Sequence, residues 1–147
     1  MLSLKLITGA VLLARGVLGE GVHLFNCSPL SGDAWPYPYV SVAVYCANDA
    51  DCSDVNHTIP NDDTCIVSTS TNGEFHQWAS GTEQSCTFPG SGVTFTWNIP
   101  TSVGSLPAYS YVGTGSNGFK TFAGFKDDGT NGAKYNFHSC SKRYYYV

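Results

Sequence analysis

The chain is poor in charge, in methionine and in any apolar repeat that would indicate a helix. Only 12% of its 147 residues are charged, and it contains one methionine. After the first 19 residues, no stretch sustains an apolar period of 3.6, so we expect at most one short helical turn near Ala50–Val55. No apolar run reaches the roughly 20 residues that a membrane-spanning helix requires. These absences exclude a helical bundle and a helical membrane span.

Basic residues are also scarce in residues 20–147. Eleven acids stand against five bases there, a net charge of −6 with neutral histidines. Nine acids precede residue 84, whereas the bases all follow residue 119: Lys120, Lys126, Lys134, Lys142 and Arg143. We interpret the pattern as solvated charge on a sheet surface. No nucleic-acid partner is expected.

The start of the chain has the pattern of an export signal. Met1–Lys5 carries one positive charge, Leu6–Ala14 is an unbroken apolar run, and small residues stand at Val17 and Gly19. This pattern predicts a signal peptide over residues 1–19, cleaved after Gly19. The remaining residues, 20–147, have the length of one domain. We therefore expect a secreted, extracellular, monomeric protein.

Cysteine usage agrees with an oxidising destination. Six cysteines lie in the predicted mature domain without any CxxC pair: Cys27, Cys46, Cys52, Cys65, Cys86 and Cys140. An even number in a secreted domain predicts three disulfides, with all 15 pairings open. A metal site is not expected because paired ligand spacings are missing, and the acidic turn at 49–54 lacks the glycine and closing glutamate of an EF-hand. No cofactor is expected.

Strand periodicity and turn residues fill the mature domain. Apolar and polar residues alternate in Tyr39–Cys46 and Val93–Ile99. Weaker strand candidates cover 22–26, 64–70, 74–79, 108–112, 118–122, 134–138 and 143–147, and Asn72-Gly73 is the best candidate for a type I′ hairpin turn. Turn signals about every ten residues indicate a sandwich or barrel. The predicted fold is all-β: a single compact, disulfide-stapled β-sandwich or small barrel with little or no helix.

Two sequons predict surface glycosylation, at Asn26 and at Asn56. We expect Asn56 to be the better acceptor, because Cys27 inside the first sequon can be bridged before a glycan is added.

Acid–base chemistry has a few candidate residues. Glu74 and His76 stand two apart, on one face of a predicted strand, and His138 is close to Lys142 in sequence. Together they define an alternative function, a small secreted hydrolase and most plausibly a ribonuclease or other nuclease. No spacing requires this arrangement, and no GxSxG motif is present. An enzyme is therefore the less favoured class.

Aromatic residues give the leading hypothesis. Trp35, Tyr37 and Tyr39 stand in a proline-stiffened loop, and tyrosines occupy 144–146 at the end of the chain (Tyr144, Tyr145 and Tyr146). Flat, stiff rings stack on sugars and on partner proteins at low entropic cost. Consecutive strand residues face opposite sides, so we expect an exposed ring among the last three. The sequence thus favours a non-catalytic protein that binds a cell-wall polysaccharide or a host surface component.

Several motifs together resemble a known group. They are Val22–Cys27 (VHLFNC), Val44–Cys52 (VYCANDADC), Gln84–Pro89 (QSCTFP), Gly92–Asn98 (GVTFTWN) and Tyr109–Gly118 (YSYVGTGSNG). In these motifs the chain resembles small secreted cysteine-rich proteins of fungi, chiefly mushroom-forming ones. The resemblance implies an extracellular fungal protein, effector-like or wall-associated, and assigns no role to any residue. A toxin or structural wall protein is a further alternative.

Overall fold

Strands dominate the computed structural model, which describes residues 19–30, 37–54 and 56–147. The predicted signal peptide up to residue 18, and Trp35, lie outside these ranges. The strands are β1 (Gly21–Pro29), β2 (Tyr39–Cys46), β3 (Thr64–Ser70), β4 (Glu83–Thr87), β5 (Thr94–Asn98), β6 (Tyr111–Ser116), β7 (Thr121–Lys126), β8 (Gly132–Tyr135) and β9 (His138–Tyr146). Two short 3-10 helices, η1 (Asp49–Ser53) and η2 (Thr101–Ser105), complete the set. Within the described ranges no helix is long and apolar enough to cross a membrane.

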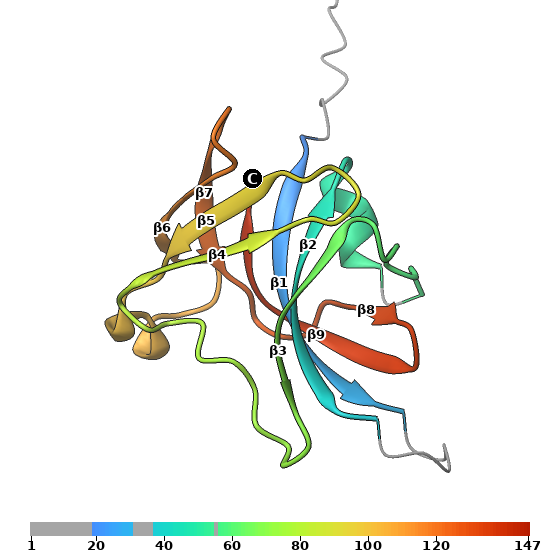
Figure 1. Ribbon diagram of the computed structural model, residues 1–147. Coiled ribbons are helices and arrows are strands. Elements are labelled where there is room, and N and C mark those ends of the chain that lie inside the picture. The colour runs from blue at the N-terminus through green and yellow to red at the C-terminus, as the bar shows by residue number, and fades with distance from the viewer. Residues whose placement is uncertain (1–18, 31–36, 55) are drawn as a thin grey trace, which may run out of the picture.

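The strands form one antiparallel sheet that curls into a nearly closed barrel (Figure 1). Its order is β3-β2-β1-β9-β7-β6-β5-β4, and β8 pairs only with β9. Apart from β8, neighbouring strands in the barrel are consecutive along the chain, and β1 pairs with the last strand, β9. This is an up-and-down barrel, so the predicted all-β fold is confirmed in its barrel form.

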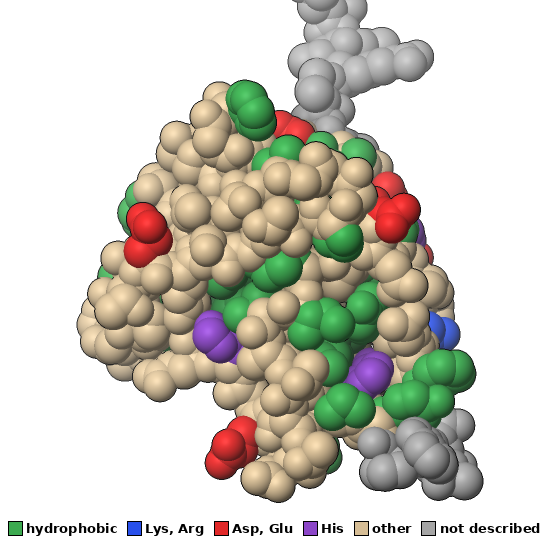
Figure 2. Space-filling view, in the orientation of Figure 1, with side chains coloured by type: hydrophobic (Ala, Val, Ile, Leu, Met, Phe, Trp, Pro, Cys, Tyr) green, Lys and Arg blue, Asp and Glu red, His purple; other side chains and the backbone are tan. Residues whose placement is uncertain are grey.

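The seam of the barrel lies between β3 and β4, which no hydrogen-bonded ladder joins. A disulfide between Cys65 of β3 and Cys86 of β4 crosses it, and the Gly90 amide donates to the Asp62 carbonyl beside it at 3.0 Å. On this face, apolar side chains gather below β4 and beside β3 (Figure 2). The barrel is therefore closed covalently where backbone pairing is missing.

Side chains alternate between two separate apolar cores. Phe95, Trp97, Phe122 and Tyr146 belong to the cluster that fills the barrel, and all four are fully buried. A second cluster, which includes Phe25, Val42 and Tyr135, lies on the outer face of β1 and β2 under β8 and η1. Because successive side chains point to opposite faces of a strand, the same strands contribute residues to both clusters.

All six cysteines are paired, which confirms the three predicted disulfides and fixes their connectivity. Cys27–Cys140 joins directly opposed residues of β1 and β9, and Cys46–Cys52 ties η1 to the end of β2. η1 lies at the helical turn predicted near Ala50–Val55, but the prediction of at most one such turn is wrong, because η2 is a second one.

The segment 74–79 is not a strand, contrary to prediction. Only Trp78 of this segment is buried; it packs in the barrel core, and its indole donates to Asn26 Oδ1 at 2.9 Å. The predicted hairpin turn is also wrong. Gly73 has a positive φ of 82° but Asn72 does not, and β3 and β4 on either side do not pair.

Candidate functional site

The aromatic residues singled out in the sequence do not form one surface. Tyr144 and Tyr146 are 8% and 0% exposed and point into the barrel, so they are core residues rather than binding contacts. Tyr145 points outward and is half-buried. Tyr37 and Tyr39 are half-buried. The Tyr37 ring stacks on that of Phe137 with 5.0 Å between the ring centroids, and the Tyr39 ring meets that of Phe75 edge-on with 5.5 Å between centroids.

A row of rings, the aromatic row, crosses the outer face of three neighbouring strands. It consists of Tyr111 in β6, Phe125 in β7 and Tyr145 in β9, which are directly opposed in the strand register. The ring centroids are 6.1 Å apart between Tyr111 and Phe125 and 5.5 Å apart between Phe125 and Tyr145. Cross-strand aromatic contacts of this kind fix ring orientation. Tyr111, at the open end, is 57% exposed.

A polar hollow of about 200 Å³ adjoins the row at Tyr145. η1 supplies Asp49 and Ser53, and the segment before β6 supplies Tyr109. The connection between β7 and β8 supplies Asp127 and Asn131, and β9 supplies Lys142 and Tyr145. These side chains include hydrogen-bond donors and acceptors, which a hydroxyl-rich ligand needs.

A buried ion-pairing group lies at the edge of this hollow. His23 in β1 is fully buried, and its Nε2 lies 2.7 Å from Asp49 Oδ1. Burial lowers the pKa of His23, and the hydrogen bond from His23 lowers the pKa of Asp49. The close contact between these two side chains holds η1 against the sheet.

Lys142 is a buried amine with an unusual partner. It is 2% exposed, and its Nζ donates to Ser53 Oγ at 2.7 Å. Within the described residues no carboxylate oxygen lies within 4.0 Å of this Nζ. Burial lowers the pKa of Lys142. A serine hydrogen-bonded to a buried lysine amine is one form of nucleophile–base pair.

Tyr109 is held in a strained position beside the hollow. Its φ is 67°, which is rare for a residue with a bulky side chain. Its amide donates to the Lys126 carbonyl at 2.7 Å, and its hydroxyl donates to Asp128 at 2.7 Å. That hydroxyl contact raises the pKa of Tyr109, which is 57% exposed. Such strain is maintained only where the surroundings fix it, and it is concentrated at functional sites.

The structure does not bring the candidate acid–base residues together by hydrogen bonds or ion pairs. The ring nitrogens of buried His138 face the carbonyl oxygens of Tyr135 and Pro38 at 3.3 and 2.8 Å. His76 Nε2 lies 3.2 Å from Gln84 Oε1, and Glu74 is exposed. Within the described residues no hydrogen bond or ion pair joins any two of His76, His138 and Glu74.

The sequons and the acidic turn have different surroundings. Asn56 is exposed in a turn, whereas Asn26 is half-buried and its Oδ1 accepts hydrogen bonds from Trp78 and Ser41. The acidic turn forms η1. In the described part of the chain, the grouping of metal-ligand types is His23 with Cys46 and Cys52, and these two sulfurs are bonded to each other.

Known proteins supply no template for this site: no protein-family model, no curated protein and no solved structure matches the chain. Sequence reasoning missed Tyr109, Tyr111 and Phe125. The pair Tyr109 and Tyr111 lies within the Ala108–Val112 strand candidate, two residues apart, and that spacing was the available signal.

Proposed function

We propose that the protein is a secreted, non-catalytic binding domain whose ligand is an extracellular polysaccharide. The observation that carries the proposal is the aromatic row directly beside the polar hollow, with Tyr109 and Tyr111 exposed at its edge. Sugars present apolar C–H faces and many hydroxyls, so a binding site combines flat rings with nearby hydrogen-bonding groups. The three disulfides fit a protein made for an oxidising compartment.

The rigidity of the site supports the same proposal. Phe125 and Tyr145 pack in line behind Tyr111, and Asp128 holds the hydroxyl of Tyr109. Rings that are ordered before binding lose little entropy when a ligand arrives. The fungal wall-associated family that the sequence resembles remains a proposal of origin, and it agrees with a wall polysaccharide as ligand.

Retention on insoluble chitin and β-glucan tests this proposal. We expect Tyr111→Ala and Tyr109→Ala each to weaken retention about two- to tenfold, because one aromatic contact contributes about 0.5–1.5 kcal/mol. Phe119→Ala is the matched control, since Phe119 is 89% exposed and outside the row. No retention of the wild-type protein, or equal losses in Phe119→Ala and Tyr111→Ala, would refute the proposal.

A hydrolase is the second candidate, and it rests on the Ser53–Lys142 contact. Ser53 Oγ would attack an ester carbonyl while Lys142 Nζ takes the hydroxyl proton and returns it to the leaving alcohol; water then releases the acid. Covalent labelling by a fluorophosphonate probe tests it. Labelling that is lost in both Ser53→Ala and Lys142→Met supports hydrolysis, and an unlabelled wild-type protein excludes this mechanism.

A further inference from the structure

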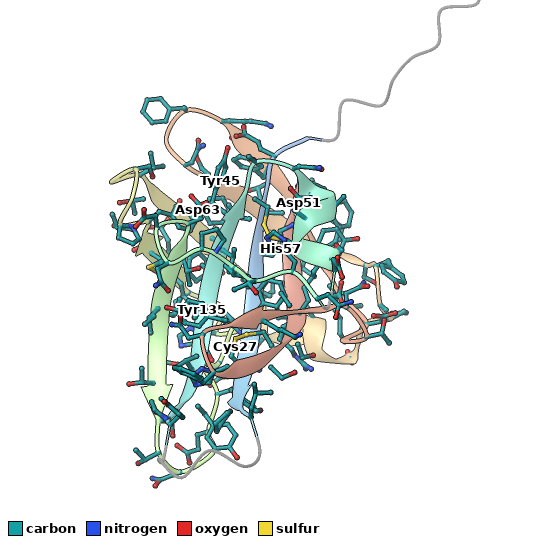
Figure 3. All side chains as sticks on the ribbon, turned by 90° about the vertical axis from the view of Figure 1, so that its right-hand side faces the viewer. Cys27, Tyr45, Asp51, His57, Asp63 and Tyr135 are labelled. Atoms are coloured by element: carbon teal, nitrogen blue, oxygen red, sulfur yellow. A yellow bond between two sulfur atoms is a disulfide. The ribbon has the colours of Figure 1, made fainter. Side chains whose placement is uncertain are left out.

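A second hollow opens at the end of the barrel where β1, β3 and β5 begin and β2, β4 and β6 end. This mouth pocket has a volume of about 220 Å³ and shares no residue with the polar hollow. Figure 3 places two of its residues, Tyr45 and Asp63, beside each other, and the Tyr45 amide donates to the Asp63 carbonyl at 2.9 Å. Because its lining differs entirely from that of the polar hollow, the mouth pocket is a separate site on the same molecule.

Apolar side chains form most of the pocket wall. Val22 and Phe88 are buried, Val93 is half-buried, and the Tyr45 ring lies 6.2 Å from that of Phe88. An apolar cavity of about 150 Å³ is known to hold benzene. The mouth pocket thus has room for one aromatic ring and a short side arm.

Two carboxylates line the pocket, and they differ in their partners. Glu20 accepts hydrogen bonds from the Tyr45 hydroxyl at 2.7 Å and from Lys120 at 3.3 Å, and these contacts lower its pKa. The side-chain oxygens of Asp63 accept no hydrogen bond from any described residue, and the side chain is only half-buried. Asp63 is therefore the acceptor that remains for a ligand.

Charge selects the ligand class. The lining contains the carboxylates of Glu20 and Asp63 and no basic side chain, since Lys120 reaches Glu20 from outside the wall. An anionic ligand would be repelled by Asp63 with only the neutral donors of Ser91 and Asn117 to offset that repulsion, whereas an ammonium group gains a charge-assisted hydrogen bond. A ring fills the apolar part at the same time.

We propose that the mouth pocket binds a small aromatic amine, with its ring against the neighbouring side chains of Phe88 and Val93 and its ammonium group on Asp63. The proposal is independent of polysaccharide binding, because the two sites share no residue.

Calorimetric titration of the secreted protein with 4-hydroxyphenethylamine tests it, beside 3-(4-hydroxyphenyl)propionate, which has the same ring and the opposite charge. We expect the amine to bind at least about tenfold more tightly than the acid, because only the amine pairs with Asp63. Asp63→Asn should remove about a tenfold preference while leaving the pocket its shape. Glu83→Gln, a change at an exposed acid outside the pocket, is the matched control and should leave the affinities for the amine and the acid unchanged.

Val93→Trp fills the pocket and should abolish binding, with circular dichroism to verify the fold. Three results would overturn the proposal: no binding of the amine at millimolar concentration, equal binding of the amine and the acid, or unchanged binding in a folded Val93→Trp variant. Tyr111→Ala should leave amine binding intact, so that loss of polysaccharide binding and loss of amine binding are separate outcomes.

Discussion

Removing the disulfide at the barrel seam is the sharpest test of how this fold is closed. Cys65 and Cys86 are separated by 21 residues in sequence, and Cys46 and Cys52 by six. The chain-entropy relation gives about 3.3 kcal/mol for the first bridge and about 2.2 kcal/mol for the second. With an unfolding entropy of about 2.1 cal/mol/K per residue, these values correspond to losses in Tm of about 12 and 8 °C.

We expect the Cys65→Ala/Cys86→Ala variant to lose more in Tm than the chain-entropy relation gives, because no ladder joins β3 to β4 once the bridge is gone. Alanine is the replacement of choice since it leaves no buried hydroxyl. Thermal melts by circular dichroism give the Tm, and amide hydrogen exchange should show faster opening of β3 and β4. The Cys46→Ala/Cys52→Ala variant should keep that protection. A smaller Tm loss for the seam variant than for this control would refute the covalent closure of the barrel.

Two further predictions concern stability. Gly124→Ala should cost about 1–3 kcal/mol in urea unfolding, because a Cβ there would overlap the Tyr146 ring, while Gly104→Ala, which meets nothing, should be nearly neutral. Stability should also fall with acid, since the folded-state pKa values of His23 and Asp49 both lie below their ordinary values and the unfolded chain binds more protons. Urea midpoints should be constant near neutral pH, decline below pH 6.5 as His23 of the unfolded chain becomes protonated, and decline again below pH 3.8 as Asp49 of the unfolded chain becomes protonated. The His23→Leu variant should not show the decline below pH 6.5. If that decline persists in the variant, His23 is not its cause.

The strands that the sequence predicted well are those whose own side chains specify them. β2 begins and ends where the alternation of Tyr39–Cys46 predicts, and β3 has the bounds of the weaker candidate Thr64–Ser70. β4 (Glu83–Thr87) was missed because its residues are mostly polar, and its conformation is imposed by pairing with β5 and by the Cys65–Cys86 bridge. Residues 74–79 were predicted as a strand, but they pair with no other strand and only Trp78 among them is buried.

The site was harder to predict because alternation shows that successive side chains face opposite sides of a strand, but not which side faces the barrel interior. Consecutive tyrosines at 144–146 must alternate, and the parity argument correctly placed one ring on the outer face, but that ring, Tyr145, is half-buried rather than exposed as predicted. Only the three-dimensional barrel decides that Tyr144 and Tyr146 face inward, so that Tyr145 joins Phe125 outside. The Ser53–Lys142 contact joins residues 89 positions apart, and no local pattern announces such a pairing.

The packing of the barrel determines where a ligand can bind. An eight-stranded barrel is just wide enough for its own side chains, and Phe95, Trp97 and Tyr146 occupy the interior here. Gly115 and Gly124 lie against those rings and leave no room even for a Cβ. A ligand must therefore use the outer face or the mouth, where Tyr111 and Asp63 respectively retain exposed surface and unused hydrogen-bonding capacity. Because substitutions at these two positions leave the interior untouched, loss of binding without loss of stability is the outcome that separates recognition from folding.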